Sequence, residues 1–294
     1  MNRTVARISR LFHRTLQSVL AHNCITVAQS AAYLSMIALF PALIIAAALV
    51  GYLPYTAPLR YQLAQFFLRI LPADVVPLLE SYFATAGHTP KTAQAMVIGI
   101  FVSITGASSV IVTLMQGFRR AHGLPDDCWT FWQRRLRAYA LVPLSLVPLT
   151  AASMLVVFGH FAVSAWMAMH ILPEARTAVY MLTLIVRWAI AFVSSIGIIA
   201  LIYHMGTPMR QSWRRTIPGA VLATAMWFLT TLAFGWYVTR FANYSRVYGS
   251  LGAGIALLFW LYIISLSVLC GAEFNAQFFR ESEGQGDAQI PLPK

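Results

Sequence analysis

The most constraining feature of the sequence is a long uncharged stretch near its C-terminal end. It lies between Arg246 and Glu273, includes the glycines Gly249 and Gly252, and is mostly apolar from Ile255 to Cys270. About twenty apolar residues in a helix cross a hydrocarbon core of about 30 Å, because a helix rises about 1.5 Å per residue. Similar stretches recur along the chain. The sequence therefore predicts an all-α integral membrane protein.

The composition supports this fold class. Of 294 residues, 59% are hydrophobic and only 10% are charged, whereas soluble domains are about 25% charged. The three cysteines are far apart and form no CxxC pair, so neither a disulfide framework nor a metal site is expected. The net charge of +12 is gathered between the apolar stretches, which favours a role in membrane topology over a nucleic-acid-binding face.

We expect a transmembrane domain over residues 24–279. Before it, residues 1–23 are basic and amphipathic, which predicts a helix on a negatively charged membrane surface; a solvated basic tail is the alternative. The prolines in residues 54–92 predict an amphipathic or re-entrant helical segment between the first two spans. Residues 280–294 are expected to form a disordered cytoplasmic tail. The six predicted spans are 25–53, 93–118, 138–169, 178–203, 217–237 and 251–272.

The distribution of basic residues predicts the orientation. Six spans place both termini on the same side, and 14 of the 21 Lys and Arg residues then lie on that side, against six on the other. By the positive-inside rule both termini are cytoplasmic. Counting residues 54–92 as a seventh crossing would remove this asymmetry.

Small residues and one proline indicate where helices pack closely. Pro41 should kink the first span, because it removes one backbone hydrogen bond. Gly99, Ser103 and Gly106 share one face of the second span at the spacing that lets helix backbones approach. Tight packing is the simpler interpretation of this face, and a polar pathway is the alternative. Further glycines expected at close helix contacts are Gly249, Gly252 and Gly271.

A few polar residues inside the apolar spans are candidates for a substrate pathway. Polar and ionisable groups in membrane spans are costly and usually face the interior of the bundle. Arg187 is deep if its helix starts near Thr177, and can reach the interface if the helix starts near Thr183, which we favour slightly. Glu273 either serves the pathway or pairs with a cytoplasmic arginine. The full candidate set is Arg187, Glu273, Asn275, Ser103 and Tyr33.

The basic loop 119–137 predicts an interface rather than a reaction centre. Its aromatic residues, Trp129 among them, suit the membrane–water boundary. Asp126 and Asp127 are expected to cap a helix that starts near Cys128, in preference to binding a metal.

The sequence has no recognisable catalytic motif. The seven histidines are scattered without an HExxH pattern, and neither a GxSxG elbow nor a GxxxxGK[ST] loop occurs. We therefore expect no enzyme activity, no cofactor and no bound nucleic acid.

Several motifs in order carry a resemblance to a known family. The C-terminal motif combines Tyr248–Ala253, Trp260–Tyr262, Gly271–Glu273 and Asn275, and Ala31–Pro41 supplies a second motif. Together they resemble the YihY/BrkB family of inner-membrane proteins, once labelled ribonuclease BN. The resemblance covers about residues 20–280 and implies six spans in a bacterial inner membrane.

The resemblance implies little about activity. The family has been linked to serum resistance as a virulence factor, and some members to export of a lipid A precursor, while the ribonuclease label is regarded as a misassignment. Together with the polar candidates, this favours a transporter or flippase-like exporter of an amphipathic anionic lipid. Its expected partners are membrane lipids, including an anionic lipid or a lipid A precursor. The alternative is a non-transporting scaffold for envelope assembly or serum resistance. The oligomeric state does not follow from the sequence.

Overall fold

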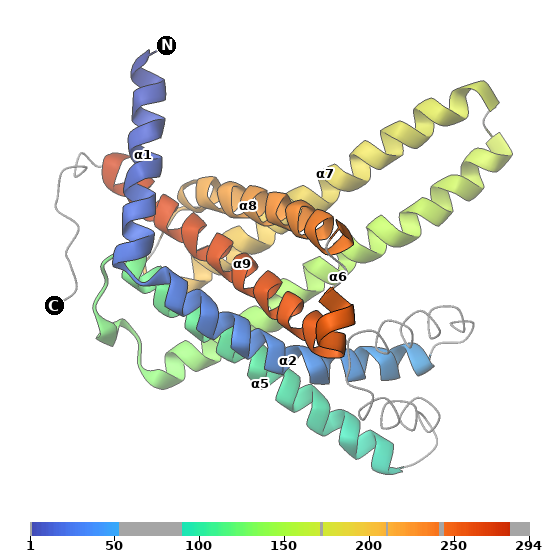
Figure 1. Cartoon of the computed structure of the whole chain (residues 1–294), viewed down its shortest axis with the longest axis horizontal. Helices are drawn as coiled ribbons and strands as arrows, with labels where there is room; N and C mark the ends of the chain where they lie inside the picture. Colours follow the sequence, from blue (N-terminus) through green and yellow to red (C-terminus); the bar gives the residue numbers. More distant parts are fainter. Residues whose placement is uncertain (1, 53–89, 171–172, 210, 241–243, 283–294) are drawn as a thin grey trace. The chain divides into compact units, whose positions relative to one another are not determined.

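A computed structural model describes residues 2–52, 90–170, 173–209, 211–240 and 244–282. Within these ranges the protein is helical and contains no strand, which confirms the all-α part of the predicted fold (Figure 1). The helices are α1 (Asn2–Ala21), α2 (Cys24–Tyr52), α5 (Pro90–Ala121), the short 3₁₀ helix η1 (Asp126–Cys128), α6 (Phe131–His170), α7 (Pro173–Gly206), α8 (Trp213–Arg240) and α9 (Tyr244–Ser282).

Four segments among the described residues are long and apolar enough to cross a membrane. They are Val97–Ala121, Val179–Gly206, Trp213–Tyr237 and Gly254–Glu281. Each has at least 18 residues of high hydropathy and few charges, which matches the thickness of a hydrocarbon core. The chain is therefore a multi-pass membrane protein, and the count of six spans stays a prediction.

Two predicted segments, 54–92 and 280–294, lie largely outside the described residues. The expected amphipathic or re-entrant segment 54–92 is described only from Pro90, where α5 begins. The tail predicted to be disordered from residue 280 begins instead as helix, because α9 continues to Ser282. The rest of that tail also lies outside the described residues.

The chain divides into two compact units. Unit 1 contains Met1–His22, Gly117–Met226 and Ser267–Lys294, and unit 2 contains Asn23–Gln116 and Trp227–Leu266. Helices α5, α8 and α9 each contribute residues to both units.

In unit 2, hydroxyl groups on apolar helices are satisfied by their own backbone. Ser35 donates to the carbonyl of Ala31 at 2.7 Å, and Ser109 donates to that of Thr105 at 2.9 Å. Such bonds remove most of the cost of a polar group in an apolar setting. The indole of Trp260 on α9 donates to the hydroxyl of Thr231 on α8 at 3.3 Å. These hydroxyls therefore do not by themselves indicate a water-filled path.

Unit 1 holds the N-terminal helix against the C-terminal one. One face of α1 is buried, and Phe12 contacts Phe274 of α9 with ring centroids 5.7 Å apart. Phe12 is still 49% exposed at the edge of this contact, and Leu16 and Leu20 beside it are 62% and 58% exposed. Helix α1 thus has a docked face and an exposed apolar face, and its expected contact with a membrane surface stays a prediction. Among the side chains of α1 that the structure describes, from Ser9 onward, the buried ones are Leu11, Thr15, Ser18 and Val19.

The start of α6 corrects the predicted helix cap. Asp126 and Asp127 lie inside η1, no side chain caps that element, and Asp126 forms an ion pair with Arg119. The cap of α6 is Thr130, whose hydroxyl accepts from the backbone N–H of Gln133 at 3.4 Å, while the Gln133 amide oxygen accepts from the N–H of Thr130 at 3.3 Å. This reciprocal pair is a capping box, a stronger start signal than adjacent aspartates after a proline.

Candidate functional site

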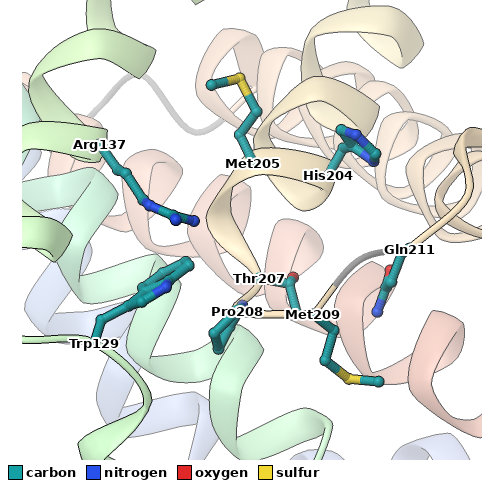
Figure 2. Close-up of a pocket in the computed structure, with 8 residues that line it drawn as sticks. All are labelled: Trp129, Arg137, His204, Met205, Thr207, Pro208, Met209 and Gln211. Carbon is teal, nitrogen blue, oxygen red and sulfur yellow. The ribbon is translucent and has the colours of Figure 1, made fainter.

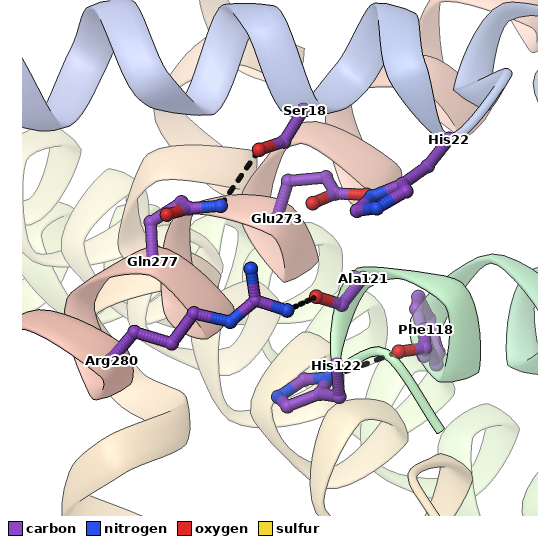
Figure 3. A network of polar contacts seen from close by, with 8 residues as sticks. All are labelled: Ser18, His22, Phe118, Ala121, His122, Glu273, Gln277 and Arg280. Carbon is purple, nitrogen blue, oxygen red and sulfur yellow. Dashed lines mark hydrogen bonds and ion pairs between the residues drawn. The ribbon is translucent and has the colours of Figure 1, made fainter. Parts of the chain in front are cut away.

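The candidate site is a buried polar cluster at the C-terminal part of α9, within unit 1 (Figure 3). At its centre the Nδ1 atom of His22 lies 2.7 Å from the Oε1 atom of Glu273. The Glu273 side chain is fully buried, and His22 is also buried. A carboxylate in an apolar segment is costly unless it is hydrogen-bonded and paired. His22 supplies the hydrogen bond, and it is a histidine rather than the arginine considered from the sequence.

A second bond lies one helical turn away from the first. The amide of Gln277 donates to the Ser18 hydroxyl at 2.7 Å, and both side chains are buried (Figure 3). Residues four apart lie on the same face of a helix. The pairs Ser18–Gln277 and His22–Glu273 therefore run antiparallel along one seam and attach α1 to α9 at two successive turns.

Asn275 ties α9 to the beginning of α8. Its Oδ1 atom accepts from the backbone N–H of Gly219 at 2.6 Å, and its Nδ2 atom donates to the carbonyl of Thr216 at 3.0 Å. These two backbone groups flank Pro218, which has no N–H to donate. Because both ends of the amide bond to α8, a packing role is favoured for this predicted pathway residue.

The backbones of α8 and α9 approach closely at Gly219 and Gly271. A Cβ atom on Gly271 would lie 2.8 Å from Cβ of Ala223 and would collide with Gly219 and the Tyr203 hydroxyl. That hydroxyl already donates to the carbonyl of Val268 at 2.5 Å. Gly271 thus occupies a position where only hydrogen fits.

His122 and Arg280 extend the cluster to the end of α5. The Nδ1 atom of His122 lies 2.9 Å from the carbonyl of Phe118, and its Nε2 atom lies 2.6 Å from the amide nitrogen of Gln211. A carbonyl can only accept, so Nδ1 carries the proton and Nε2 accepts from Gln211 in a neutral ring. Arg280 donates to the carbonyl of Ala121 at 3.3 Å (Figure 3).

The pKa of His122 is lowered from its usual value. Burial is the largest cause, because it disfavours the imidazolium form, and the positive charge of Arg280 acts in the same direction. The Phe118 carbonyl and the carboxylate of Glu273 oppose the shift without cancelling it. His122 directly follows the apolar segment Val97–Ala121.

This shift predicts how stability depends on pH. A proton binds His122 more readily in the unfolded chain, so the free energy of unfolding should fall as the pH drops below the unfolded pKa of about 6.5. We expect the unfolding temperature of the wild-type protein in detergent to decrease between about pH 7.5 and pH 5 more steeply than that of His122→Gln, which keeps a donor and an acceptor. Parallel pH curves for the two proteins would show that His122 does not titrate differently on folding.

Arg187 lies elsewhere in unit 1. Helix α7 begins at Pro173, earlier than either start considered from the sequence, which puts Arg187 about 21 Å from the helix start. It is also about 24 Å along α7 from Tyr203, the residue that bonds α7 to α9. Its partly exposed side chain has a buried Nε atom with no hydrogen-bond partner among the described residues. The structure does not bring Arg187 to Glu273, and its depth in a membrane stays a prediction.

The remaining predicted pathway residues, Tyr33 and Ser103, belong to unit 2. Tyr33 is 62% exposed, and Ser103 is partly exposed. Their role in a pathway stays a prediction.

The predicted packing residues of unit 2 are only partly described. A Cβ atom on Gly106 of α5 would lie 2.8 Å from Cβ of Ala38 on α2, so these two helices touch there. Gly99 lies on α5, and Pro41 lies inside α2. Gly249 and Gly252 lie in the first turns of α9, where side-chain surroundings are outside the described part of the chain.

Sequence reasoning missed the partners of the candidate residues, namely His22, Ser18, Gln277, Tyr203 and Gln211. One signal was present in the sequence. Ser18 and His22 are four residues apart near the N-terminus, and so are Glu273 and Gln277 near the C-terminus. Among the described residues, no group of three or more His, Cys, Asp or Glu side chains is arranged to hold a metal ion.

The sequence matches known membrane proteins over most of its length. It is 26% identical over 83% of this chain to "Putative ribonuclease-like protein YfkH" of Bacillus subtilis (strain 168), covering 86% of that protein. It is 27% identical over 98% of this chain to a UPF0761 membrane protein of Vibrio cholerae serotype O1, covering 95% of it. A UPF0761 membrane protein of Tolumonas auensis is 25% identical over 83% of this chain and is covered over 77% of its length.

No solved structure matches the chain. The family model described as "Virulence factor BrkB" matches residues 15–291, which includes α1 from Thr15 and the whole polar cluster of α9. With that match and four apolar helices of membrane-spanning length, the chain belongs to the virulence factor BrkB family of membrane proteins.

Proposed function

We propose that this protein moves an amphipathic, anionic component of the cell envelope across the bacterial inner membrane, as a transporter or flippase-like exporter. In this proposal the chain crosses the membrane six times, both termini are cytoplasmic, and the N-terminal helix rests on the inner surface. The basic segments that follow α5 and α7 then face the cytoplasm, as the positive-inside rule requires.

The observation that carries the proposal is the buried pair of His22 and Glu273 at 2.7 Å. Ionisable residues within membrane helices are rare and often belong to proton relays or substrate paths. A histidine bonded to a carboxylate is an arrangement that can pass a proton between its two members. The pair is therefore suited to coupling proton movement to a conformational step between α1 and α9.

Arg187 supports the anionic character of the proposed substrate. It is the only charged residue between Arg176 and Arg210, and its Nε atom is buried without a hydrogen-bond partner among the described residues. A guanidinium in an apolar helix is a natural partner for a phosphate group. The distance from the cluster on α9 suggests separate roles, with recognition at Arg187 and coupling at Glu273.

The test is lipid movement in vesicles that contain the purified protein. A fluorescent phosphatidic acid in one leaflet should reach the other faster with the wild-type protein than in empty vesicles. Glu273→Gln and Arg187→Gln should each slow this step at least about tenfold, the effect of losing roughly 1.4 kcal/mol in the rate-limiting state. The matched control is Glu281→Gln, the same change on the same helix two turns later.

The outcome also separates transport from the scaffold alternative. Transport is rejected if wild-type protein moves no lipid faster than empty vesicles do. If Glu273→Gln and Arg187→Gln also restore serum resistance to a deletion strain, a scaffold that needs neither residue becomes the better description.

A further inference from the structure

A cavity of about 680 Å³ lies in unit 1, apart from the buried pair on α9 (Figure 2). Its wall comes from Trp129 before α6, Arg137 on α6, the end of α7 and the loop that follows α7. The volume falls within the range of about 300 to 1,000 Å³ that is usual for small-molecule sites. The lining combines one cation with aromatic and thioether groups, which restricts the kind of molecule that fits.

Arg137 provides the positive charge of this cavity. Its guanidinium lies 4.3 Å from the centroid of the Trp129 ring. Stacking fixes the plane of a guanidinium and leaves its N–H groups available at the edge. Arg137 has no carboxylate partner within the part of the chain that the structure describes. A held guanidinium with free donors is a binding group for an anionic oxygen.

His204 adds a second polar group that needs a partner. Its ring stacks on Trp213 with centroids 4.4 Å apart, so its orientation is also fixed. The Nδ1 atom is buried and has no hydrogen-bond partner among the described residues. Buried polar atoms are nearly always hydrogen-bonded, so this nitrogen needs a partner that the described residues do not supply, and a small shift of the ring would present it to the cavity.

The other walls are apolar and adaptable. Met205 and Met209 line the cavity together with the Trp129 ring (Figure 2). Methionine side chains are flexible and polarizable, and they fit alkyl groups of varied shape. A purely ionic ligand would leave these groups unused. The combination suits an anion that carries a hydrocarbon part.

We propose that this cavity binds the phosphate headgroup of an anionic lipid. Arg137 and His204 hold the phosphate, and the first methylene groups of the lipid lie against Met205 and Met209. Tryptophan and arginine in the segment around residues 129–137 suit the headgroup region of a bilayer, which favours a lipid over a soluble phosphate ester.

The cavity is also connected to the candidate site. Gln211 lines the cavity and its amide bonds to Nε2 of His122 at 2.6 Å. His122 follows Ala121, whose carbonyl accepts from Arg280 on α9. This proposal deepens the proposed transport function. The role of the cavity in lipid movement rests on that function, but lipid binding to the cavity can be measured without transport.

The experiment is native mass spectrometry of the full-length protein in mild detergent with added phosphatidic acid or phosphatidylethanolamine. The wild-type protein should retain phosphatidic acid in preference to the zwitterionic lipid. Arg137→Gln should weaken phosphatidic acid binding about tenfold, since it removes a charge-assisted contact. The matched control is Arg120→Gln, which removes an exposed arginine outside the cavity and should bind as the wild type does.

A second variant makes it possible to distinguish loss of lipid binding from loss of folding. Met209→Glu places a negative charge in the cavity wall and should weaken phosphatidic acid binding while retention of phosphatidylethanolamine is unchanged. Unfolding temperatures within a few degrees of the wild type show that either variant is folded. The proposal fails if both variants retain phosphatidic acid as the wild type does, or if wild-type protein does not distinguish the two lipids.

A separate arm distinguishes a lipid headgroup from a free anion. Inorganic phosphate at millimolar concentration should leave phosphatidic acid bound. If it displaces the lipid completely, the cavity is a site for soluble phosphate and the lipid assignment is wrong. If the wild-type protein moves lipid in vesicles but Arg137→Gln binds phosphatidic acid normally, this site is rejected and the transport proposal stands. If Arg137→Gln loses binding but the wild-type protein moves no lipid, the site stands and the transport proposal is rejected.

Discussion

The Gly271→Ala variant is expected to unfold at a much lower temperature than the wild-type protein. Its new methyl group would collide with the Gly219 backbone and the Tyr203 hydroxyl and would lie 2.8 Å from Cβ of Ala223. Overpacking lowers the free energy of unfolding by about 1 to 3 kcal/mol. We expect a value at the upper end of this range, because the Gly219 backbone atoms cannot rotate away from the new methyl group. The higher helix propensity of alanine offsets only about 1 kcal/mol of this loss. Thermal unfolding in detergent measures the difference.

The matched control is Gly235→Ala on α8. A Cβ atom there meets nothing within 4 Å, so the same chemical change adds no collision. Gly235→Ala should be as stable as the wild type or slightly more stable, because alanine favours the helix. Equal unfolding temperatures for Gly271→Ala and Gly235→Ala would contradict the close contact of α8 and α9 at Gly219 and Gly271.

The fold class followed from the sequence, but the ends of the helices did not. Hydropathy marks the part of a helix that suits lipid, and a helix continues beyond that part wherever its backbone remains satisfied. Helix α9 accordingly runs from Tyr244 to Ser282, while the predicted span covered 251–272. Helix α6 begins at Phe131 rather than 138, where the capping box of Thr130 and Gln133 sets its start.

Of the residues in the candidate site, only those on α9 could be predicted from the sequence. Glu273 stands out because it ends a long uncharged stretch, and any such carboxylate needs a partner. Its partner His22 lies 251 residues away, and the matching four-residue spacings of Ser18 and His22 and of Glu273 and Gln277 do not by themselves say which residues pair. The arginines of α1 indicated a membrane surface, although the buried Thr15 and Ser18 on the same helix, and His22 just after its end, lie inside unit 1.

The hydrogen-bond partners seen in the structure distinguish the two polar candidates on α9, Asn275 and Glu273. Asn275 and Glu273 looked alike in the sequence, as polar residues within an apolar stretch. In the structure Asn275 bonds to the backbone of α8 through both ends of its amide, whereas Glu273 meets another ionisable side chain. An amide that bonds to the backbone of a neighbouring helix holds the two helices together, whereas a carboxylate that bonds to a histidine is the basis of the proton coupling proposed above.

The second large effect is expected at the buried pair of His22 and Glu273. Removing one partner of a buried ion pair costs about 3 to 5 kcal/mol, because the other partner stays buried without it. Replacing both by apolar residues of similar volume is often close to neutral. We therefore expect Glu273→Leu and His22→Leu each to lower the unfolding temperature strongly, and the double variant to regain most of the loss.

The pair of Ser18 and Gln277 provides the matched control for this cycle. It joins the same two helices one turn away through a neutral hydrogen bond, and such a bond contributes only about 1 kcal/mol. Ser18→Ala and Gln277→Leu should thus show a much smaller coupling energy. Additive effects of His22→Leu and Glu273→Leu would mean that the pair does not act as a unit.

The double variant also separates stability from function. If His22 and Glu273 only attach α1 to α9, a stable double variant should move lipid as fast as the wild type does in vesicles. If the pair carries a proton during transport, the same variant should be folded and inactive, because leucine has no ionisable group. A folded double variant with wild-type lipid movement would therefore reject proton coupling at this pair. The attachment of α1 to α9 through its apolar contacts would remain.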